Sequence, residues 1–242
     1  MGKDLVIIGK SSVSFRNKEI ENKSRIIDLL NSLKLENSEF LKEMCIKWNS
    51  PNSYYSQHMK GKQYEEYKKQ KEQELERCLK VLSWQFSEYE DDEYCYDSKQ
   101  YYLEGPYGLN LEINKYFFEV SIWIGRYFHW FNTNDDYNVL WREKWRLIIY
   151  KITNILGGEY VMYFPDNASD ISIYLPCDYC FPKEMEEHLK ADIKDLDQVV
   201  ELISERYSQP INLAEADKLF EIRDKDPFVI DRFEDLDKTL KK

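Results

Sequence analysis

The chain has 242 residues, of which 43% are hydrophobic and 33% are charged. This composition is ordinary for a folded globular protein, and the length is sufficient to bury a sizeable core without disulfides or metals. The formal net charge of −11 disfavours binding to nucleic acid or anionic membranes and favours a basic partner. The sequence contains no apolar run of the length that a transmembrane helix needs.

The cysteine content and the first residues of the chain indicate the cellular compartment. The chain has five cysteines, an odd number, and opens MGKDLVIIGK without an apolar stretch of signal-peptide length. We therefore expect a reduced, cytoplasmic protein.

The first third of the chain predicts one strand followed by helices. Residues 4–8 form a short β-branched run that ends before Gly9, which is typical of a buried strand. Residues 24–33 and 38–48 repeat apolar side chains at helical spacing. A longer helix is expected from about residue 63 to residue 86, with a polar first half that projects into solvent. It should end by about Glu88, because the acidic residues that follow are unfavourable at a helix C-terminus.

The middle of the chain predicts antiparallel strands. After the turn at residues 105–106, apolar and polar residues alternate over 109–113, and a second strand is expected at 117–124, with a hairpin between them. A third strand is expected at 127–131.

A helix is predicted at residues 138–156, ending at Gly157. Trp141 and Trp145 belong to its apolar stripe, so we expect them in the core. Arg142 and Arg146 are then expected on the opposite, solvated side.

The last third predicts two more strands and two more helices. Strands are expected at 160–164 and 171–175, separated by a Pro-Asp-Asn turn. One helix is expected to start at Asp195 and a shorter one at Asn212, where Glu215 completes a capping box.

These elements favour an α+β fold, a single domain with a mainly antiparallel sheet packed against several α-helices. Within residues 1–242 we expect a helix-rich part (1–98), a part with sheet and helices (99–235) and a loose tail (236–242).

Two short motifs suggest a ligand but are incomplete. Residues 9–11, Gly-Lys-Ser, match only the end of a phosphate-binding loop, and Asp4 occupies the position of its first glycine. Cys177 and Cys180 have the spacing of a zinc-binding pair, but only Cys95 and His188 remain as further ligands, at no typical spacing. We therefore predict neither a cofactor nor a metal.

His129 is the basis of the alternative hypothesis that the protein is an enzyme. It lies between two aromatic residues, and Glu119, Asp166 or Asp170 would have to orient it as a general base. A general base at His129 would imply a hydrolase with a pocket near this residue. The residues around His129 contain no nucleophile motif, so a histidine bonded to the backbone is the preferred interpretation.

The segment 87–97, SEYEDDEYCYD, contains six carboxylates and three tyrosines but no lysine or arginine. It lacks the ligand spacing and mid-loop glycine of a calcium site, so either a solvated acidic loop or a docking surface remains. Carboxylates steer a basic partner and tyrosines supply contact area. The sequence therefore favours a non-enzymatic protein that captures a basic protein partner, such as an immunity or inhibitor protein. The expected partner-binding residues are Glu88, Tyr89, Glu90, Asp91, Asp92, Glu93, Tyr94, Tyr96 and Asp97.

Overall fold

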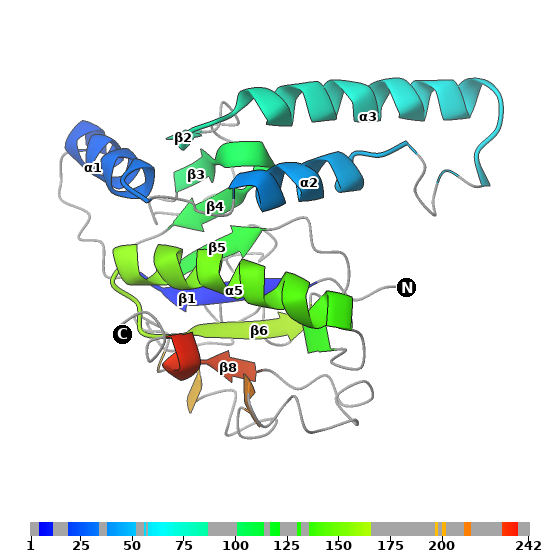
Figure 1. The fold of residues 1–242 in the computed structure, drawn as a ribbon. Helices are drawn as coiled ribbons and strands as arrows, with labels where there is room; N and C mark the ends of the chain where they lie inside the picture. The colour runs from blue at the N-terminus through cyan, green and yellow to red at the C-terminus, as the bar shows by residue number, and fades with distance from the viewer. Residues whose placement is uncertain are drawn as a thin grey trace, which may run out of the picture.

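A computed structural model of the chain describes residues 5–11, 19–33, 38–51, 56, 58–86, 101–113, 117–121, 130–131, 136–165, 197, 200–201, 211–213 and 229–236. Within these residues the chain is a single α+β domain, in which an eight-stranded sheet packs against α-helices (Figure 1). All neighbouring strands are antiparallel except β7 and β8. The fold class predicted from the sequence is confirmed.

The main elements follow one another as β1 (Leu5–Lys10), α1 (Glu19–Asn31), α2 (Ser38–Trp48), α3 (Lys62–Lys80), β2 (Gln85–Phe86), β3 (Tyr101–Glu104), the short 3-10 helix η2 (Pro106–Gly108), β4 (Asn110–Ile113), β5 (Phe117–Ser121), α5 (Asp136–Ile155), β6 (Val161–Pro165), β7 (Ile211–Asn212) and β8 (Val229–Asp231).

Strand β1 lies in the interior of the sheet although it is the first strand in the chain. The strand order is β2-β3-β4-β5-β1-β6-β8-β7, so β1 pairs with β5 on one side and β6 on the other. Its β-branched residues suit this position, because Ile7 and Ile8 point to opposite faces of the sheet and both are buried. The sheet is therefore complete only when the first residues of the chain have inserted between much later strands.

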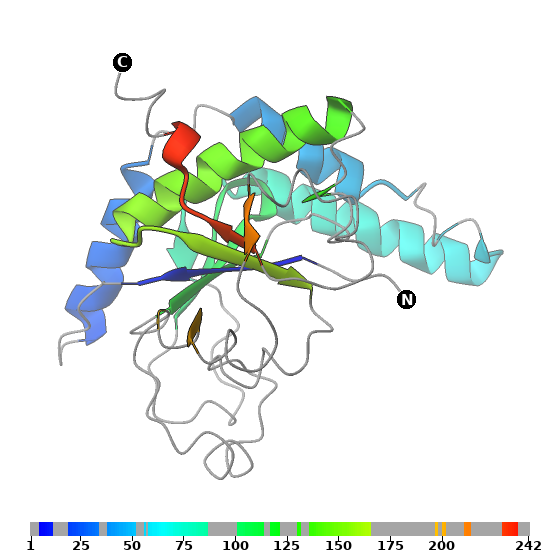
Figure 2. The same ribbon diagram turned by 90° about the horizontal axis from the view of Figure 1, so that it is seen from below.

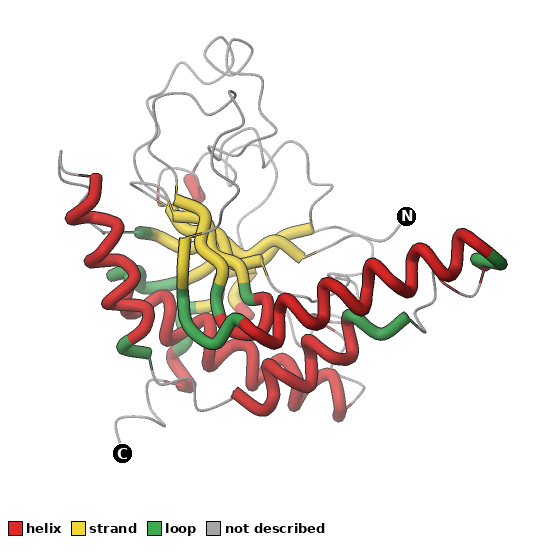
Figure 3. The backbone as a smooth tube through the Cα atoms, turned by 90° about the horizontal axis from the view of Figure 1, so that it is seen from above, coloured by secondary structure: helices red, strands yellow, loops and turns green. Residues whose placement is uncertain are grey.

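Helices α1, α2, α3 and α5 lie on one face of the sheet (Figures 2 and 3). Alternate strand residues point toward them, as the period of two requires. These residues form one apolar core together with Trp130, Trp141 and Trp145. The strand residues in this core include Ile7, Leu103, Leu111, Phe118, Val120, Val161, Tyr163 and Val229.

The structure confirms most of the predicted elements it describes. The strands predicted at 109–113 and 117–124 form the β4–β5 pair, in which Ile113 lies opposite Phe118. The helix predicted at 138–156 is α5, and Gly157 follows it with a φ of 77° that favours glycine. The predicted strand at 160–164 is β6, although its antiparallel partners are β1 and β8.

Helix α3 ends at Lys80, six residues before the predicted end at residue 86. Val81 is already extended, and its carbonyl accepts a hydrogen bond from the backbone N–H of Tyr107. Trp84 is buried, and its backbone N–H donates to the Asn31 side chain at 2.8 Å. Because these tertiary contacts hold the chain in an extended form, the apolar stripe does not continue, and Leu82 is exposed.

Other predictions are corrected or lie outside the described residues. Trp130 and Phe131 are helical, so the strand predicted at 127–131 is wrong at its last two residues. Asn212 ends the short strand β7, directly before a helical residue, Leu213. The strand predicted at 171–175 lies outside the described residues. None of the helices in the described ranges combines the length and apolarity needed to cross a bilayer.

Candidate functional site

The segment predicted to bind a partner connects two neighbouring strands at the edge of the sheet. The chain leaves β2 at Phe86 and enters β3 at Tyr101, and these strands pair with Gln85 opposite Glu104 and Phe86 opposite Leu103. Strand β2 is the outermost strand on this side. All nine predicted partner-binding residues, from Glu88 to Asp97, lie outside the described residues; the described residues that flank the stretch 87–100 are Phe86 of β2 and Tyr101 of β3.

The base of this hairpin is well packed. The rings of Phe86 and Tyr101 meet edge to face with centroids 5.7 Å apart, and Tyr101 is buried. On the other side of the hairpin, Arg77 of α3 forms an ion pair with Glu104. Gln85 also contacts the Glu104 carboxylate, at 3.5 Å. Arg77, a basic residue next to the hairpin, is therefore already paired with a carboxylate of the fold.

A row of polar residues crosses the face of the sheet opposite the helices, beginning next to this hairpin. It runs through Tyr102, Glu112 and Glu119, which lie opposite one another on β3, β4 and β5, and it ends at β1, where the buried Ile8 lies opposite Glu119. Glu112 and Glu119 lie directly opposite each other on antiparallel strands. Two acidic residues of the described sheet therefore lie on the side opposite the helices.

The position of Glu119 bears on the enzyme hypothesis. His129, Asp166 and Asp170 lie outside the described residues, so their proposed contacts are untested. Trp130 follows His129 directly and packs in the core on the helix side of the sheet, with its ring 5.0 Å from that of Tyr163. Glu119 alternates with the core residues Phe118 and Val120 and therefore faces the opposite side.

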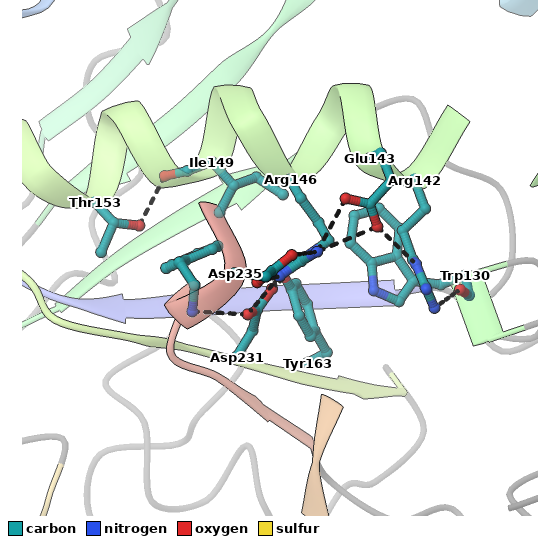
Figure 4. Close-up of polar contacts among 10 residues, drawn as sticks. Trp130, Arg142, Glu143, Arg146, Ile149, Thr153, Tyr163, Asp231 and Asp235 are labelled. Atoms are coloured by element: carbon teal, nitrogen blue, oxygen red, sulfur yellow. Dashed lines mark hydrogen bonds and ion pairs between the residues drawn. The ribbon is translucent and has the colours of Figure 1, made fainter. Parts of the chain in front are cut away.

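Arg142 and Arg146, predicted to be solvated, are buried instead, each with 4% of its surface exposed. Helix α5 is covered on more than one side, because the segment after β8 packs along it as well (Figure 4). Arg142 donates to the backbone carbonyl of Trp130 at 3.2 Å. Arg146 lies at the centre of a cluster with Glu143, Asp231 and Asp235, which we call the Arg146 cluster.

Arg146 uses its whole guanidinium group in this cluster. It binds Asp231 through Nε at 2.7 Å and Nη2 at 3.0 Å, and Asp235 through both terminal nitrogens at 2.9 Å. Glu143 accepts a further bond from Nη1 at 3.0 Å. A guanidinium has five N–H donors, and these contacts engage all of them. Arg146 therefore has no donor left for a ligand, and the cluster joins α5 to the C-terminal strand.

Tyr163 completes the Arg146 cluster from strand β6. Its hydroxyl donates to Asp231 at 3.0 Å. Burial and the nearby carboxylate of Asp231 raise the pKa of Tyr163 well above its ordinary value, so the hydroxyl stays protonated. The hydrogen bonds from Arg146 lower the pKa of Asp235, so this contact stabilises the fold at neutral pH and is lost as the pH falls through that lowered value.

Lys10, the lysine of the incomplete phosphate-binding motif, is part of a polar contact instead. Its ammonium lies 3.3 Å from the carboxylate of Asp197, which also accepts a hydrogen bond from the hydroxyl of Tyr160 at 2.6 Å. Gly9 is within strand β1, and the ring of Phe118 packs against it. Residues 5–10 thus form a strand at the place where a phosphate-binding motif would need a loop.

The predicted zinc-type pair, Cys177 and Cys180, lies outside the described residues together with Cys95 and His188. Within the part of the chain that the structure describes, no three His, Cys, Asp or Glu side chains are grouped to hold a metal ion. Sequence reasoning missed the Arg146 cluster, for which the apolar spacing of the helices gave no signal.

Comparison with known proteins yields no relative: no family model, curated protein or solved structure matches this chain.

Proposed function

We propose that this protein is a non-enzymatic binding protein that captures a basic protein partner through the acidic, tyrosine-containing segment 87–97, as an immunity or inhibitor protein does. We place this activity in the cytoplasm, as the sequence predicts, and do not expect nucleic acid as the partner. The proposal is supported above all by the combination of an uncompensated acidic sequence with the way its two ends are anchored in the fold.

The composition of the segment suits recognition of a positive surface. Six carboxylates occur within eleven residues that contain no basic side chain. Such a concentration of charge attracts a basic protein over roughly a Debye length, which is about 8 Å at physiological salt, and speeds association. The tyrosines would then provide contact area at low entropic cost.

The anchoring supports the same role. Because β2 pairs with β3 at the sheet edge, the described residues on either side of the stretch 87–100 belong to neighbouring strands. Ordering a segment on binding costs less when its ends are already fixed. Arg77 of α3 is a basic residue next to the β2–β3 pair, and its ion pair with Glu104 already engages its charge.

The test compares two variants with the same change in net charge. In the first, Glu90, Asp91, Asp92 and Glu93 become Gln or Asn. In the control, the exposed residues Glu39 and Glu43 of α2 and Glu65 and Glu66 of α3 become Gln. A basic protein that co-purifies with the wild-type chain in a one-to-one complex is the probe, and its association rate is measured at several salt concentrations.

We expect the segment variant to associate about tenfold more slowly at low salt and to lose much of its salt dependence. The control variant should keep at least half of the wild-type association rate, because its carboxylates belong to α2 and α3 and the segment 87–97 keeps all of its own. Equal rates for the segment variant and the wild type would contradict the proposal. So would equal losses in the two variants, since these would show an effect of net charge alone.

A further inference from the structure

A side chain of α1 meets the backbone at the outer edge of the sheet. Within the described sheet, β2 is the first strand in the order and has β3 as its neighbour on one side alone. Asn31 is the last residue of α1. Its side-chain amide donates to the carbonyl of Trp84, the residue before β2, at 3.3 Å and accepts from the Trp84 backbone N–H at 2.8 Å.

The pairing of the strands shows to which side the Trp84 backbone points. The N–H of Gly105, directly after β3, donates to the carbonyl of Leu109 at 2.6 Å, so the backbone groups of Gly105 face the β4 side. Successive residues of a strand point their backbone groups to alternate sides, so those of Glu104 face Gln85 of β2. The backbone groups of Trp84, next to Gln85, therefore point away from β3, toward the outer side of the sheet.

Both partners of this contact are fixed by the core. Leu30, next to Asn31, is fully buried, and Trp84 is buried with its ring close against Gly105. A side-chain amide carries an N–H donor and a carbonyl acceptor, the same pair of groups that a neighbouring strand presents to an edge residue. Asn31 therefore occupies the hydrogen-bonding position of an added strand, although it is itself an exposed residue.

We propose that Asn31 closes this edge of the sheet and prevents a second copy of the chain from adding a strand beside β2. Open backbone groups at a sheet edge are a template for pairing with another chain, and folded proteins cover such edges. Antiparallel pairing of two identical strands about a twofold axis satisfies both copies alike, so a second copy is the occupant that an open edge would take. The inference concerns Asn31 and stands whether or not the segment 87–97 binds a basic partner.

The test replaces Asn31 with Ala in the full chain. Ser32→Ala is the matched control, because it removes a side-chain hydrogen bond to the Leu29 carbonyl at the same helix end without changing the contact with Trp84. Sedimentation is measured over a range of protein concentrations, with dithiothreitol present to keep the thiols reduced. Sodium chloride at about 0.5 M shortens the Debye length to about 4 Å, so that repulsion between the acidic segments of two copies does not mask the pairing.

We expect the wild type and Ser32→Ala to sediment alike at every concentration, whereas Asn31→Ala should self-associate as its concentration rises. In dilute solution the Trp84 backbone amide of Asn31→Ala should exchange its hydrogen about tenfold faster than in the wild type, because it has lost its acceptor. At concentrations where this variant self-associates, the same amide should regain protection, since a strand of the second copy then supplies an acceptor.

Sedimentation of Asn31→Ala identical to that of the wild type would overturn the inference. Self-association that leaves the Trp84 amide unprotected would also overturn it, since the second copy would then be bound elsewhere. Asn31→Leu, a change to a side chain of similar size without hydrogen-bonding groups, is an independent second variant. Circular dichroism verifies that both variants are folded, and Asn31→Leu must show the same self-association and the same recovery of protection, or the inference is wrong.

Discussion

At the level of single residues, Arg146 shows how a charged side chain can be part of a core. It lies on a helix whose tryptophans face the sheet, so the helical period predicts a solvated position for it. The Arg146 cluster reverses this outcome, because Asp231 and Asp235 arrive from the other end of the chain and neutralise the charge. Tyr163 and the backbone N–H of Phe233 satisfy the remaining lone pairs of Asp231. The burial is tolerable only because every partner is present.

Replacing Arg146 with Met should therefore lower the free energy of unfolding by about 3–5 kcal/mol, since Asp231 remains buried without its counter-charge. Urea denaturation of the variant and the wild type measures this loss. Glu143→Gln is the matched control. Because the Glu143 side chain is 38% exposed, its contact with Arg146 should contribute less than about 1 kcal/mol.

The double variant Arg146→Met, Asp231→Asn isolates the reason for the loss. It removes the Arg146 and Asp231 charges together. Its loss of unfolding free energy should therefore be smaller than the sum of the losses in the two single variants. If Arg146→Met alone lowered the free energy of unfolding by less than about 1 kcal/mol, the cluster would not stabilise the fold.

At the level of elements, Gly9 sets how closely β1 can approach its neighbour. A Cβ atom at this position would collide with the ring of Phe118, which is buried on β5 directly opposite Gly9. The glycine is required because the ring packs directly over the strand. This packing accounts for the glycine of the partial nucleotide motif without a phosphate-binding loop.

Gly9→Ala should cost about 1–3 kcal/mol of unfolding free energy, because the buried Phe118 ring would have to shift to admit the methyl group. In a chain that carries Phe118→Leu, the same Gly9→Ala change should cost clearly less, since the smaller side chain leaves room for the methyl group. Thermal unfolding of the four chains provides the comparison. An equal cost in both backgrounds would mean that the ring is not the source of the strain.

Elements with a strong period in the sequence were predictable, whereas those defined by long-range contacts were not. Helix α5 and the β4–β5 pair show regular apolar repeats, and their bounds agree with the prediction to within a few residues. Strand β2 has only two residues and exists because β3 lies beside it. The early end of α3 depends on Asn31 and Tyr107, and the burial of Arg146 on Asp231, so neither could follow from local spacing.

At the level of the whole molecule, the sheet is assembled from distant parts of the chain. The strands β2 to β5 form one antiparallel series, and β6 to β8 form a second group that the chain reaches only after α5. Strand β1 is the sole connection between them within the described sheet. The acidic segment belongs to the outer end of the first series, so its support depends on a sheet that β1 holds together.

Deletion of residues 2–11 should therefore abolish cooperative unfolding, whereas deletion of residues 2–4 alone should leave the urea midpoint close to that of the wild type. Without β1, the open edges of β5 and β6 lose their partners, and the core loses Ile7. Circular dichroism across a urea titration, together with binding of a dye for exposed apolar surface, distinguishes the two deletions. If the chain without residues 2–11 still unfolds in a single sharp transition, the two groups of strands are stable without β1, and the acidic segment must be supported by the first group and its helices.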